Sequence, residues 1–463
     1  MNGEVLEESE RSGGRAGSPN CNVSDSPGEY RSRIVSADEA VAQVRSGQRV
    51  YIHNGCAEPT ELVRALTRRG AGLHDVELLH MATMGVADYS LPEFENHFRT
   101  HSLFIGANVR QAIQEGRGDY TPIFLSEIEN LFASGVLPVD VALLQCTPPD
   151  AHGFMSLGPS VDVTMAAAEC ARKVIVEIND QMPRTLGNAF LHVSQVDAFI
   201  ETSHPLAEYP QHPVTEQQRA IGRNIVGLIP DGATIQTGIG GIPEATLALL
   251  GNHKDLGIHS EMVPDGAIDL IRAGVVNGER KTLHPRKVIA GFVLGSKRLF
   301  DFIDNNAMFE FHPTSYCNDP FVIARNDRMV AINSAIEVDL TGQVCSDSMG
   351  FAPYSGIGGQ VDFLRGAARS KGGVPIIALP STARNGTVSR IATRLQPGAG
   401  VVTSRGDVHY VVTEHGVAYL HGKTLRQRTE ALIQVADPKF QDHLEAFAID
   451  AKLLSGNRST VAV

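Results

Sequence analysis

The chain has 463 residues, and its 40 Lys and Arg against 52 Asp and Glu give a formal net charge of −12. At roughly 150 residues per domain, this length predicts two or three domains with full hydrophobic cores. Hydrophobic residues at 42% and charged residues at 20% are typical of globular proteins and exclude a disordered chain, a collagen or a coiled coil. The acidic balance argues against nucleic acids and anionic membranes as partners, because both attract clustered Lys and Arg.

The six cysteines are scattered and form no CxxC pair, so the sequence indicates neither a zinc or redox motif nor a disulfide framework. This pattern fits a cytoplasmic location. No apolar run approaches the ~20 residues that cross a bilayer. Residues 1–33 combine acids and arginines with Gly, Ser and Pro and lack the apolar segment of a signal peptide. They are predicted to form a flexible tail.

The first folded element is expected just after this tail. Ser36 and Glu39 have the S-x-x-E spacing of a capping box, which predicts a helix that Gly47 closes. A strand at 49–53, a turn and a helix opened by Pro59 follow. Further apolar runs predict buried strands at 76–81, 139–146, 174–178, 233–236, 287–294, 329–336, 374–379 and 409–412. Helices are expected at 162–172, 217–228, 267–273 and 424–435, and this alternation predicts an α/β fold with open, mostly parallel sheets.

A segment at 203–215 is rich in Pro and His and lacks apolar periodicity, which predicts a linker between two domains. The domains would then span residues 34–202 and 216–463. Each half contains a strand, a loop, a helix opened by a proline (Pro59 or Pro243) and a second strand with a histidine near its end. This order indicates either a duplicated α/β unit or only the general likeness of such units.

A glycine-rich loop at 237–243 lies between a predicted strand and a predicted helix. Its glycines Gly238, Gly240 and Gly241 allow backbone N–H groups to approach a ligand, and the helix N-terminus favours negative charge. Pro243 stands where the dinucleotide fingerprint needs its third glycine, and no Walker A Lys follows. The alternative interpretation is an ordinary tight turn.

The same Gly-Ile-Gly-Gly sequence recurs at 356–359, again before a predicted helix. Two such loops could hold one ligand, or supply oxyanion-stabilising amides on one side and cofactor contacts on the other. Two unrelated turns remain the alternative.

Glu261, in the segment His-Ser-Glu-Met at 259–262, is expected at the carboxyl end of a short strand. Ligands of open α/β sheets collect outside that edge. A carboxylate there can act as a base, a metal ligand or a nucleophile, or it can merely cap the following helix. No second carboxylate or histidine forms an evident metal set with it, so no metal is expected.

Two basic side chains could bind an anionic group, although a solvated surface position is the alternative for each: Arg184 and Lys371. Glu414 is a further candidate, because it ends a predicted strand as Glu261 does. Cys56 and Cys345 are more typical of buried structural cysteines than of nucleophiles. The G-x-S-x-G and H-E-x-x-H motifs of common hydrolases are absent from the sequence.

Taken together, several motifs resemble the acetyl-CoA hydrolase/transferase family, in particular its 4-hydroxybutyrate CoA-transferases. The resemblance covers residues 34–450 and rests on segments 181–185 (QMPRT), 238–243 (GIGGIP), 259–262 (HSEM), 281–285 (KTLHP), 332–336 (INSAI), 355–362 (SGIGGQVD) and 412–416 (VTEHG).

The resemblance implies two similar α/β domains with the active site between them and a glutamate nucleophile, which maps onto Glu261. The coenzyme A (CoA) loop maps onto Gly238, Ile239, Gly240, Gly241 and Ile242. Further CoA or oxyanion contacts are implied for a second set: Asn333, Ile336, Gly358, Gly359 and Lys371. The family also implies a homo-oligomer, acyl-CoA and carboxylic acid as substrates, and no tightly bound cofactor.

An ionised carboxylate can attack a thioester without a separate base, since the ordinary pKa of Glu is ~4.3. This chemistry predicts ping-pong transfer of CoA through acyl-glutamyl anhydride and glutamyl-CoA thioester intermediates. An acyl-CoA hydrolase, which admits water to the same intermediates, is the near alternative. A non-catalytic CoA-binding protein and a dinucleotide oxidoreductase are the remaining hypotheses, and Pro243 argues against the oxidoreductase.

Overall fold

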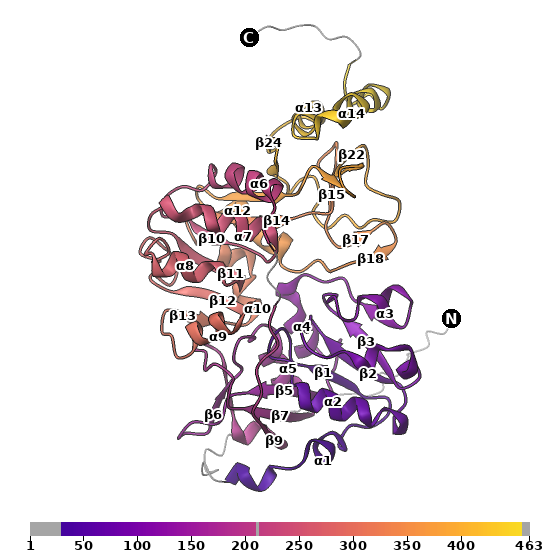
Figure 1. The fold of residues 1–463 in the computed structure, drawn as a ribbon, viewed down its shortest axis with the longest axis vertical. Helices are drawn as coiled ribbons and strands as arrows, with labels where there is room; N and C mark the ends of the chain where they lie inside the picture. The colour runs from indigo at the N-terminus through magenta and orange to yellow at the C-terminus, as the bar shows by residue number, and fades with distance from the viewer. Residues whose placement is uncertain (1–28, 210–212, 456–463) are drawn as a thin grey trace, which may run out of the picture.

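The computed structural model describes residues 29–209 and 213–455, which fold around two large sheets (Figure 1). The first sheet has seven parallel strands in the order β4-β3-β2-β1-β5-β7-β9. Its strands are β1 (Arg49–Ile52), β2 (Val76–His80), β3 (Phe98–Ser102), β4 (Gly118–Tyr120), β5 (Val141–Cys146), β7 (Lys173–Asn179) and β9 (Ala198–Thr202).

The second sheet has eight strands in the order β13-β12-β11-β10-β14-β19-β23-β24. All its neighbours pair in parallel except β24, which forms an antiparallel hairpin with β23. Its strands are β10 (Thr234–Gln236), β11 (Gly257–Val263), β12 (Val288–Val293), β13 (Phe309–Phe311), β14 (Met329–Ser334), β19 (Val374–Ala378), β23 (Tyr410–Thr413) and β24 (Gly416–Tyr419).

The two sheets share one topology. When the strands of each main sheet are ranked along the chain, leaving out the added β24, both read 4-3-2-1-5-6-7. This identity confirms the predicted α/β class with two similar, mostly parallel units, and it favours a duplicated unit over chance likeness. The limits predicted for the linker and domains stay a prediction. Residues 210–212 of that linker lie outside the described residues.

Helices connect the parallel strands. Those of the N-terminal half are α1 (Ala37–Val41), α2 (Thr60–Arg68), α3 (Arg110–Gln114), α4 (Ile128–Ala133) and α5 (Thr164–Cys170). Those of the C-terminal half are α6 (Glu216–Val226), α7 (Gly241–Leu249), α8 (Gly266–Arg272), α9 (Lys297–Ile303), α10 (Thr314–Cys317), α11 (Pro320–Ile323), α12 (Gln360–Arg369), α13 (Leu425–Gln434) and α14 (Pro438–Asp450). Across the described ranges, none of the helices is long and apolar enough to span a bilayer.

The predicted capping box is confirmed, because the Ser36 side chain accepts from the Glu39 N–H and Glu39 accepts from the Ser36 N–H. The helix it opens is shorter than predicted: α1 ends at Val41, and Gly47 instead lies in the turn before β1 with a φ of +75°. Residues 29–33 of the predicted tail belong to the described structure, whereas residues 1–28 lie outside the described residues. Tyr30, in a 3₁₀ turn, is buried with its ring 5.5 Å from that of Phe199.

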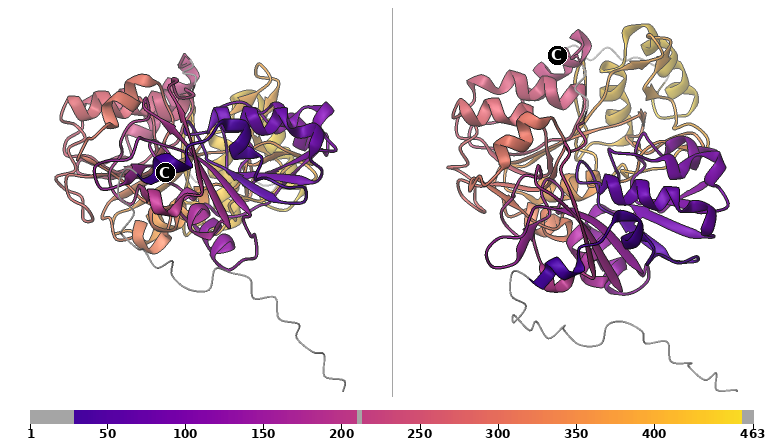
Figure 2. Two further views of the ribbon diagram at one scale, coloured as in Figure 1. Left: turned by 90° about the horizontal axis from the view of Figure 1, so that it is seen from below. Right: turned by 60° about the horizontal axis from the view of Figure 1, so that its bottom comes forward.

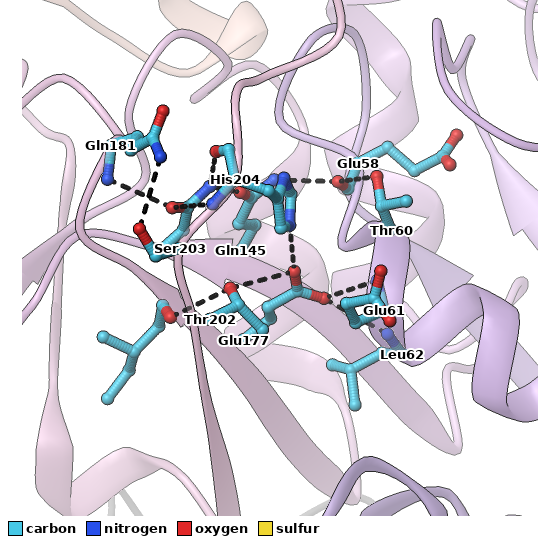
Figure 3. A network of polar contacts seen from close by, with 12 residues as sticks. Glu58, Thr60, Glu61, Leu62, Gln145, Glu177, Gln181, Thr202, Ser203 and His204 are labelled. Atoms are coloured by element: carbon cyan, nitrogen blue, oxygen red, sulfur yellow. Dashed lines mark hydrogen bonds and ion pairs between the residues drawn. The ribbon is translucent and has the colours of Figure 1, made fainter.

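A polar network beside β7 lies where the chain leaves the first sheet (Figure 3). Glu177 accepts hydrogen bonds from His204 Nε2 (2.6 Å) and from the N–H groups of Glu61 (3.0 Å) and Leu62 (3.2 Å) at the start of α2. The hydrogen bond that His204 donates to Glu177 raises the pKa of His204. One carboxylate therefore neutralises a helix N-terminus and fixes the first part of the connection to the C-terminal half.

The two halves lie against each other in all views of Figures 1 and 2, and one hydrophobic core runs through both. Buried members of this core include Leu79 and Met155 from the first half and Ile235 and Phe292 from the second. The backbone also crosses between the halves: Val161 N–H donates to Gly291 O (3.0 Å), and strand-like bridges join segments on either side. Side chains near this junction are therefore held by both halves.

Candidate active site

Glu261 lies in β11, two residues before the strand ends at Val263, so the expected position at the strand terminus is slightly wrong. The strand nonetheless carries Glu261 to the carboxyl edge of the second sheet, where the loop after β10 also begins. Glu261 does not cap the next helix, because Asp265 occupies the N-cap position of α8. The structural alternative of a capping residue is thereby excluded.

Two neutral donors contact the Glu261 carboxylate. Asn318 Nδ2 donates to Glu261 Oε2 at 2.8 Å, and the Gly359 N–H forms a second hydrogen bond. Burial raises the pKa of Glu261, and these two hydrogen bonds oppose that rise. A Cβ at Gly359 would overlap both Glu261 Oε2 and the Asn318 amide, so only glycine permits this close approach.

Asn318 was not predicted from the sequence. It directly follows α10, and the next residue, Asp319, caps α11 by accepting from the Phe321 N–H at 2.8 Å. The Asn-Asp-Pro sequence at 318–320 is typical of a turn before a helix. Its local chemistry therefore carries no signal for a contact with a glutamate 57 residues away.

The second glycine loop is fastened to a segment of the N-terminal half at 124–129, which we term the strap. Leu125 N–H donates to Gly358 O at 3.1 Å, and Ser126 donates to Asp362 through its N–H (3.2 Å) and its Oγ (2.9 Å). Burial raises the pKa of Asp362 to about 7, although the hydrogen bonds from Ser126 lower it. The strap thus holds the start of α12, where Gly359 meets Glu261.

The other end of the strap holds the segment that carries Asn318. Glu129 Oε1 and Oε2 accept from the N–H and Oγ of Ser315, each at 2.7 Å, and Thr314 Oγ1 lies 3.1 Å from Glu129 Oε1. Both donors to Glu261 are therefore positioned from one segment of the opposite half. No pattern in the sequence indicated the strap.

The first glycine loop begins beside the strand of Glu261, because Ser260 Oγ donates to Thr237 O at 3.0 Å. Gly240 has a φ of +101°, a conformation that favours glycine, and Gly238 faces open space. Gly241 opens α7, Ile239 is 36% exposed and Ile242 is buried. The loop therefore presents backbone N–H groups and one apolar side chain at the same sheet edge.

Three further predicted residues lie along this edge. Asn333, near the end of β14, donates from Nδ2 to Gln236 Oε1 at 3.2 Å, next to the first glycine loop. Ile336 is half-buried just beyond β14. Glu414 follows β23 and accepts from Gln217 Nε2 (2.7 Å) and Ser381.

Lys371 and Arg184 are not brought to this site. Lys371 is exposed in the turn that precedes β19, at the opposite, amino edge of the sheet. Arg184 pairs with Asp150 at 2.9 Å and stacks over Phe190 at 4.5 Å. Burial also raises the pKa of the Cys56 thiol to about 12, which disfavours the thiolate that a nucleophile needs.

Family comparisons match both halves of the chain. Residues 18–207 match the acetyl-CoA hydrolase/transferase N-terminal domain, and residues 295–448 match the corresponding C-terminal domain. The chain is 50% identical to the 4-hydroxybutyrate coenzyme A transferase of Clostridium kluyveri, covering 90% of this chain and 97% of that protein. It is 49% identical to the succinyl-CoA:acetate/propanoyl-CoA:succinate CoA transferase of Fasciola hepatica, with 92% and 89% covered.

Solved structures show the same architecture. RipA from Yersinia pestis superimposes with a TM-score of 0.87 at 36% identity, covering 92% of this chain and 99% of that chain. A 4-hydroxybutyrate CoA-transferase from Porphyromonas gingivalis gives 0.80 at 43% identity, with 91% and 98% covered. The chain described here belongs to the acetyl-CoA hydrolase/transferase family.

Proposed function

We propose that this protein is a CoA-transferase that exchanges CoA between an acyl-CoA and a short carboxylic acid, with Glu261 as nucleophile. The single observation that supports this most directly is a half-buried carboxylate held by two neutral donors, Asn318 Nδ2 and the Gly359 N–H. Neutral donors orient the carboxylate without a compensating positive charge, whereas an ion pair would neutralise its charge and make it a weaker nucleophile.

In the first half-reaction a Glu261 oxygen attacks the thioester carbonyl carbon, the C–S bond breaks, and an acyl-glutamyl anhydride and CoA thiolate form. The thiolate then attacks the Glu261 carbonyl carbon, which releases the free acid and leaves a glutamyl-CoA thioester. Each attack passes through an oxyanion. Donors already aimed at the carboxylate, Asn318 and Gly359, can stabilise the oxyanion on the glutamyl carbon without reorganisation.

The second acid reverses these steps: its carboxylate attacks the glutamyl-CoA thioester and releases CoA thiolate, which then takes the new acyl group from the anhydride. The acyl-CoA leaves and the Glu261 carboxylate is regenerated. We assign the loop 238–242 to CoA, because its N–H groups and the start of α7 favour phosphate or carbonyl oxygens. Asn333 adjoins this loop and is assigned with it.

Sequence identity does not select the acid. Relatives of 50% and 49% identity are named for 4-hydroxybutyrate in one case and for succinate, acetate and propanoate in the other. Short acids of this kind, including butyrate, are therefore the substrates to test. We further propose that the protein is a homo-oligomer and that it is cytoplasmic. The cytoplasmic location fits the cysteines within the described residues, which are all free: 56, 146, 170, 317 and 345.

The test is to incubate the protein with acetyl-CoA and treat it with borohydride, which reduces a glutamyl thioester. Wild-type protein should lose activity, and mass spectrometry should find the reduced residue at Glu261. Glu261→Gln should lose at least about 10³-fold in transfer rate, because its amide is not a nucleophile. Glu93→Gln, which alters an exposed surface carboxylate, is the matched control and should react as wild type.

An acceptor panel of acetate, butyrate, 4-hydroxybutyrate and succinate, with acetyl-CoA as donor, separates the alternatives. CoA release at the same rate with and without an acceptor would identify a hydrolase instead. Tight CoA binding with no turnover in either case would identify a binding protein. An unmodified Glu261 peptide after turnover and borohydride would contradict the proposed nucleophile.

A further inference from the structure

A second polar cluster lies between β12 and β13, and the proposed transfer reaction does not use it. His284, Glu310 and His312 place one ligand atom each within 4.8 Å of the others. Glu310 belongs to β13, His312 follows that strand directly, and His284 comes from the turn before β12. The sequence showed no metal set here, since an entire strand and helix separate His284 from Glu310 and His312.

The distances match a tetrahedral metal site. His284 Nδ1 lies 3.1 Å and His312 Nε2 lies 3.6 Å from Glu310 Oε2. Zinc binds nitrogen and oxygen at about 2.0–2.2 Å, so adjacent ligand atoms of a tetrahedron stand about 3.4 Å apart. The two distances to Glu310 are therefore within a few tenths of an ångström of this spacing, and each residue offers a ligand atom within 4.8 Å of those of the other two.

The hydrogen bonds around the cluster leave His284 Nδ1 and His312 Nε2 available as metal ligands. His284 Nε2 is 2.6 Å from the Tyr316 hydroxyl, which leaves Nδ1 to face Glu310. His312 Nε2 is buried and has no hydrogen-bond partner. A partner on the far nitrogen that orients a ligating histidine is a recurring feature of metal sites.

The charge of the cluster also suits a divalent cation. Glu310 carries one negative charge, and its Oε1 faces Lys287 Nζ at 3.4 Å while Oε2 faces the two histidines. All three ligand side chains are between 14% and 27% exposed, so an ion could enter and keep one water as its fourth ligand.

We propose that His284 Nδ1, Glu310 Oε2 and His312 Nε2 bind a zinc ion. The ion would tie the turn before β12 to the segment that carries Tyr316 and, two residues later, Asn318. We assign the ion a structural role, because its three ligands are different residues from Glu261 and the two donors that contact the Glu261 carboxylate.

The test uses the full chain, freed of metal with a chelator and titrated with ZnCl₂ under calorimetry, with metal content measured by mass spectrometry. We expect one zinc ion per chain and a rise in the melting temperature that saturates with zinc. Cobalt(II) in place of zinc should give the visible absorption bands of a tetrahedral site. His312→Gln should weaken zinc binding at least 10-fold, and Tyr316→Phe should weaken it about 10-fold.

His152→Gln, which alters an exposed histidine elsewhere, is the control and should bind zinc as wild type does. If His312→Gln fails to fold, Tyr316→Phe and the cobalt spectrum of wild type still decide. No bound zinc in wild type, or equal affinity in wild type and the folded His312→Gln protein, would overturn the proposal.

Discussion

At the scale of single residues, the reactivity of Glu261 depends on opposing effects on one carboxylate. Burial raises its pKa, while Asn318 and the Gly359 N–H stabilise the charged form and lower it. In the proposed reaction the attacking species is the carboxylate, so these two donors would decide the pH range of reaction as well as the stability of the oxyanion. Removal of one of these two hydrogen bonds is therefore the most direct test of how Glu261 reacts.

Asn318→Ala removes one donor, and the pKa of Glu261 should then rise further. The acid limb of the kcat/KM profile should move to higher pH, because more of the enzyme holds a protonated, unreactive Glu261 at any given pH. At the pH optimum we expect a loss of about 10²-fold, the usual cost of one oxyanion donor. Stopped assays from pH 5 to 9 measure both effects.

Asn130→Ala, on the exposed face of α4, is the control and should leave the profile in place. If Asn318→Ala loses rate but its acid limb does not move, Asn318 does not affect the pKa of Glu261, and this part of the prediction is wrong.

At the scale of elements, the strap at 124–129 joins the segments of both donors to the opposite half of the molecule. Ser126 holds Asp362 at the start of α12, and Glu129 holds Ser315 at α10. Elements far from the nucleophile in sequence therefore set the distance between its donors. A loosened strap should reduce the chemical rate more than CoA binding, because the loop 238–242 lies outside it.

Ser126→Ala deletes the 2.9 Å hydrogen bond from Ser126 Oγ to Asp362 while the backbone contact remains. We expect glutamyl-CoA thioester formation to slow about 10-fold in rapid-quench experiments, with the Kd for CoA unchanged. Ser134→Ala, an exposed serine at the end of α4, is the matched control. An equal fall in CoA affinity and rate would argue for general loosening rather than mispositioned donors.

Several elements were predicted closely, while others were missed for an identifiable reason. The apolar runs of β5 and β12 mark fully buried strands, and both were expected within two residues of their observed ends. β3 escaped detection because Arg99 and His101 interrupt its sequence, and these side chains pair with Asp119 and Glu77 along the outer strands. Cross-strand charge pairs make such a strand polar, so periodicity alone does not reveal it.

At the scale of the whole molecule, backbone hydrogen bonds as well as the shared hydrophobic core join the two halves. Phe311 N–H donates to Leu186 O and Asn188 N–H donates to Phe311 O, both at 2.8 Å, around Gly187. Val293 N–H donates to Pro159 O, also at 2.8 Å. These bonds extend the second sheet with chain from the first half, so neither half presents a complete edge by itself.

We therefore expect one cooperative unfolding transition in calorimetry, with equal calorimetric and van't Hoff enthalpies. Gly187→Ala should lower the melting temperature by several degrees, because its φ is +107° and a Cβ would overlap the Phe311 backbone. Gly116→Ala carries comparable backbone strain (φ +78°) but meets open space, so it should cost less. Two separate transitions in wild type would contradict the joined-halves interpretation.

The sequence by itself determined the α/β class, most of the buried strands, the glycine loops and Glu261, because these depend on local periodicity and on motifs a few residues long. Tertiary structure decided what surrounds Glu261, the proposed nucleophile. Asn318 and the strap reach Glu261 and the glycine loop across 57 to 236 residues of chain, and the histidines at 284 and 312 meet only when β13 docks on β12. Sequence patterns record which face of an element is buried, whereas the partner across that face is chosen by packing of the whole chain.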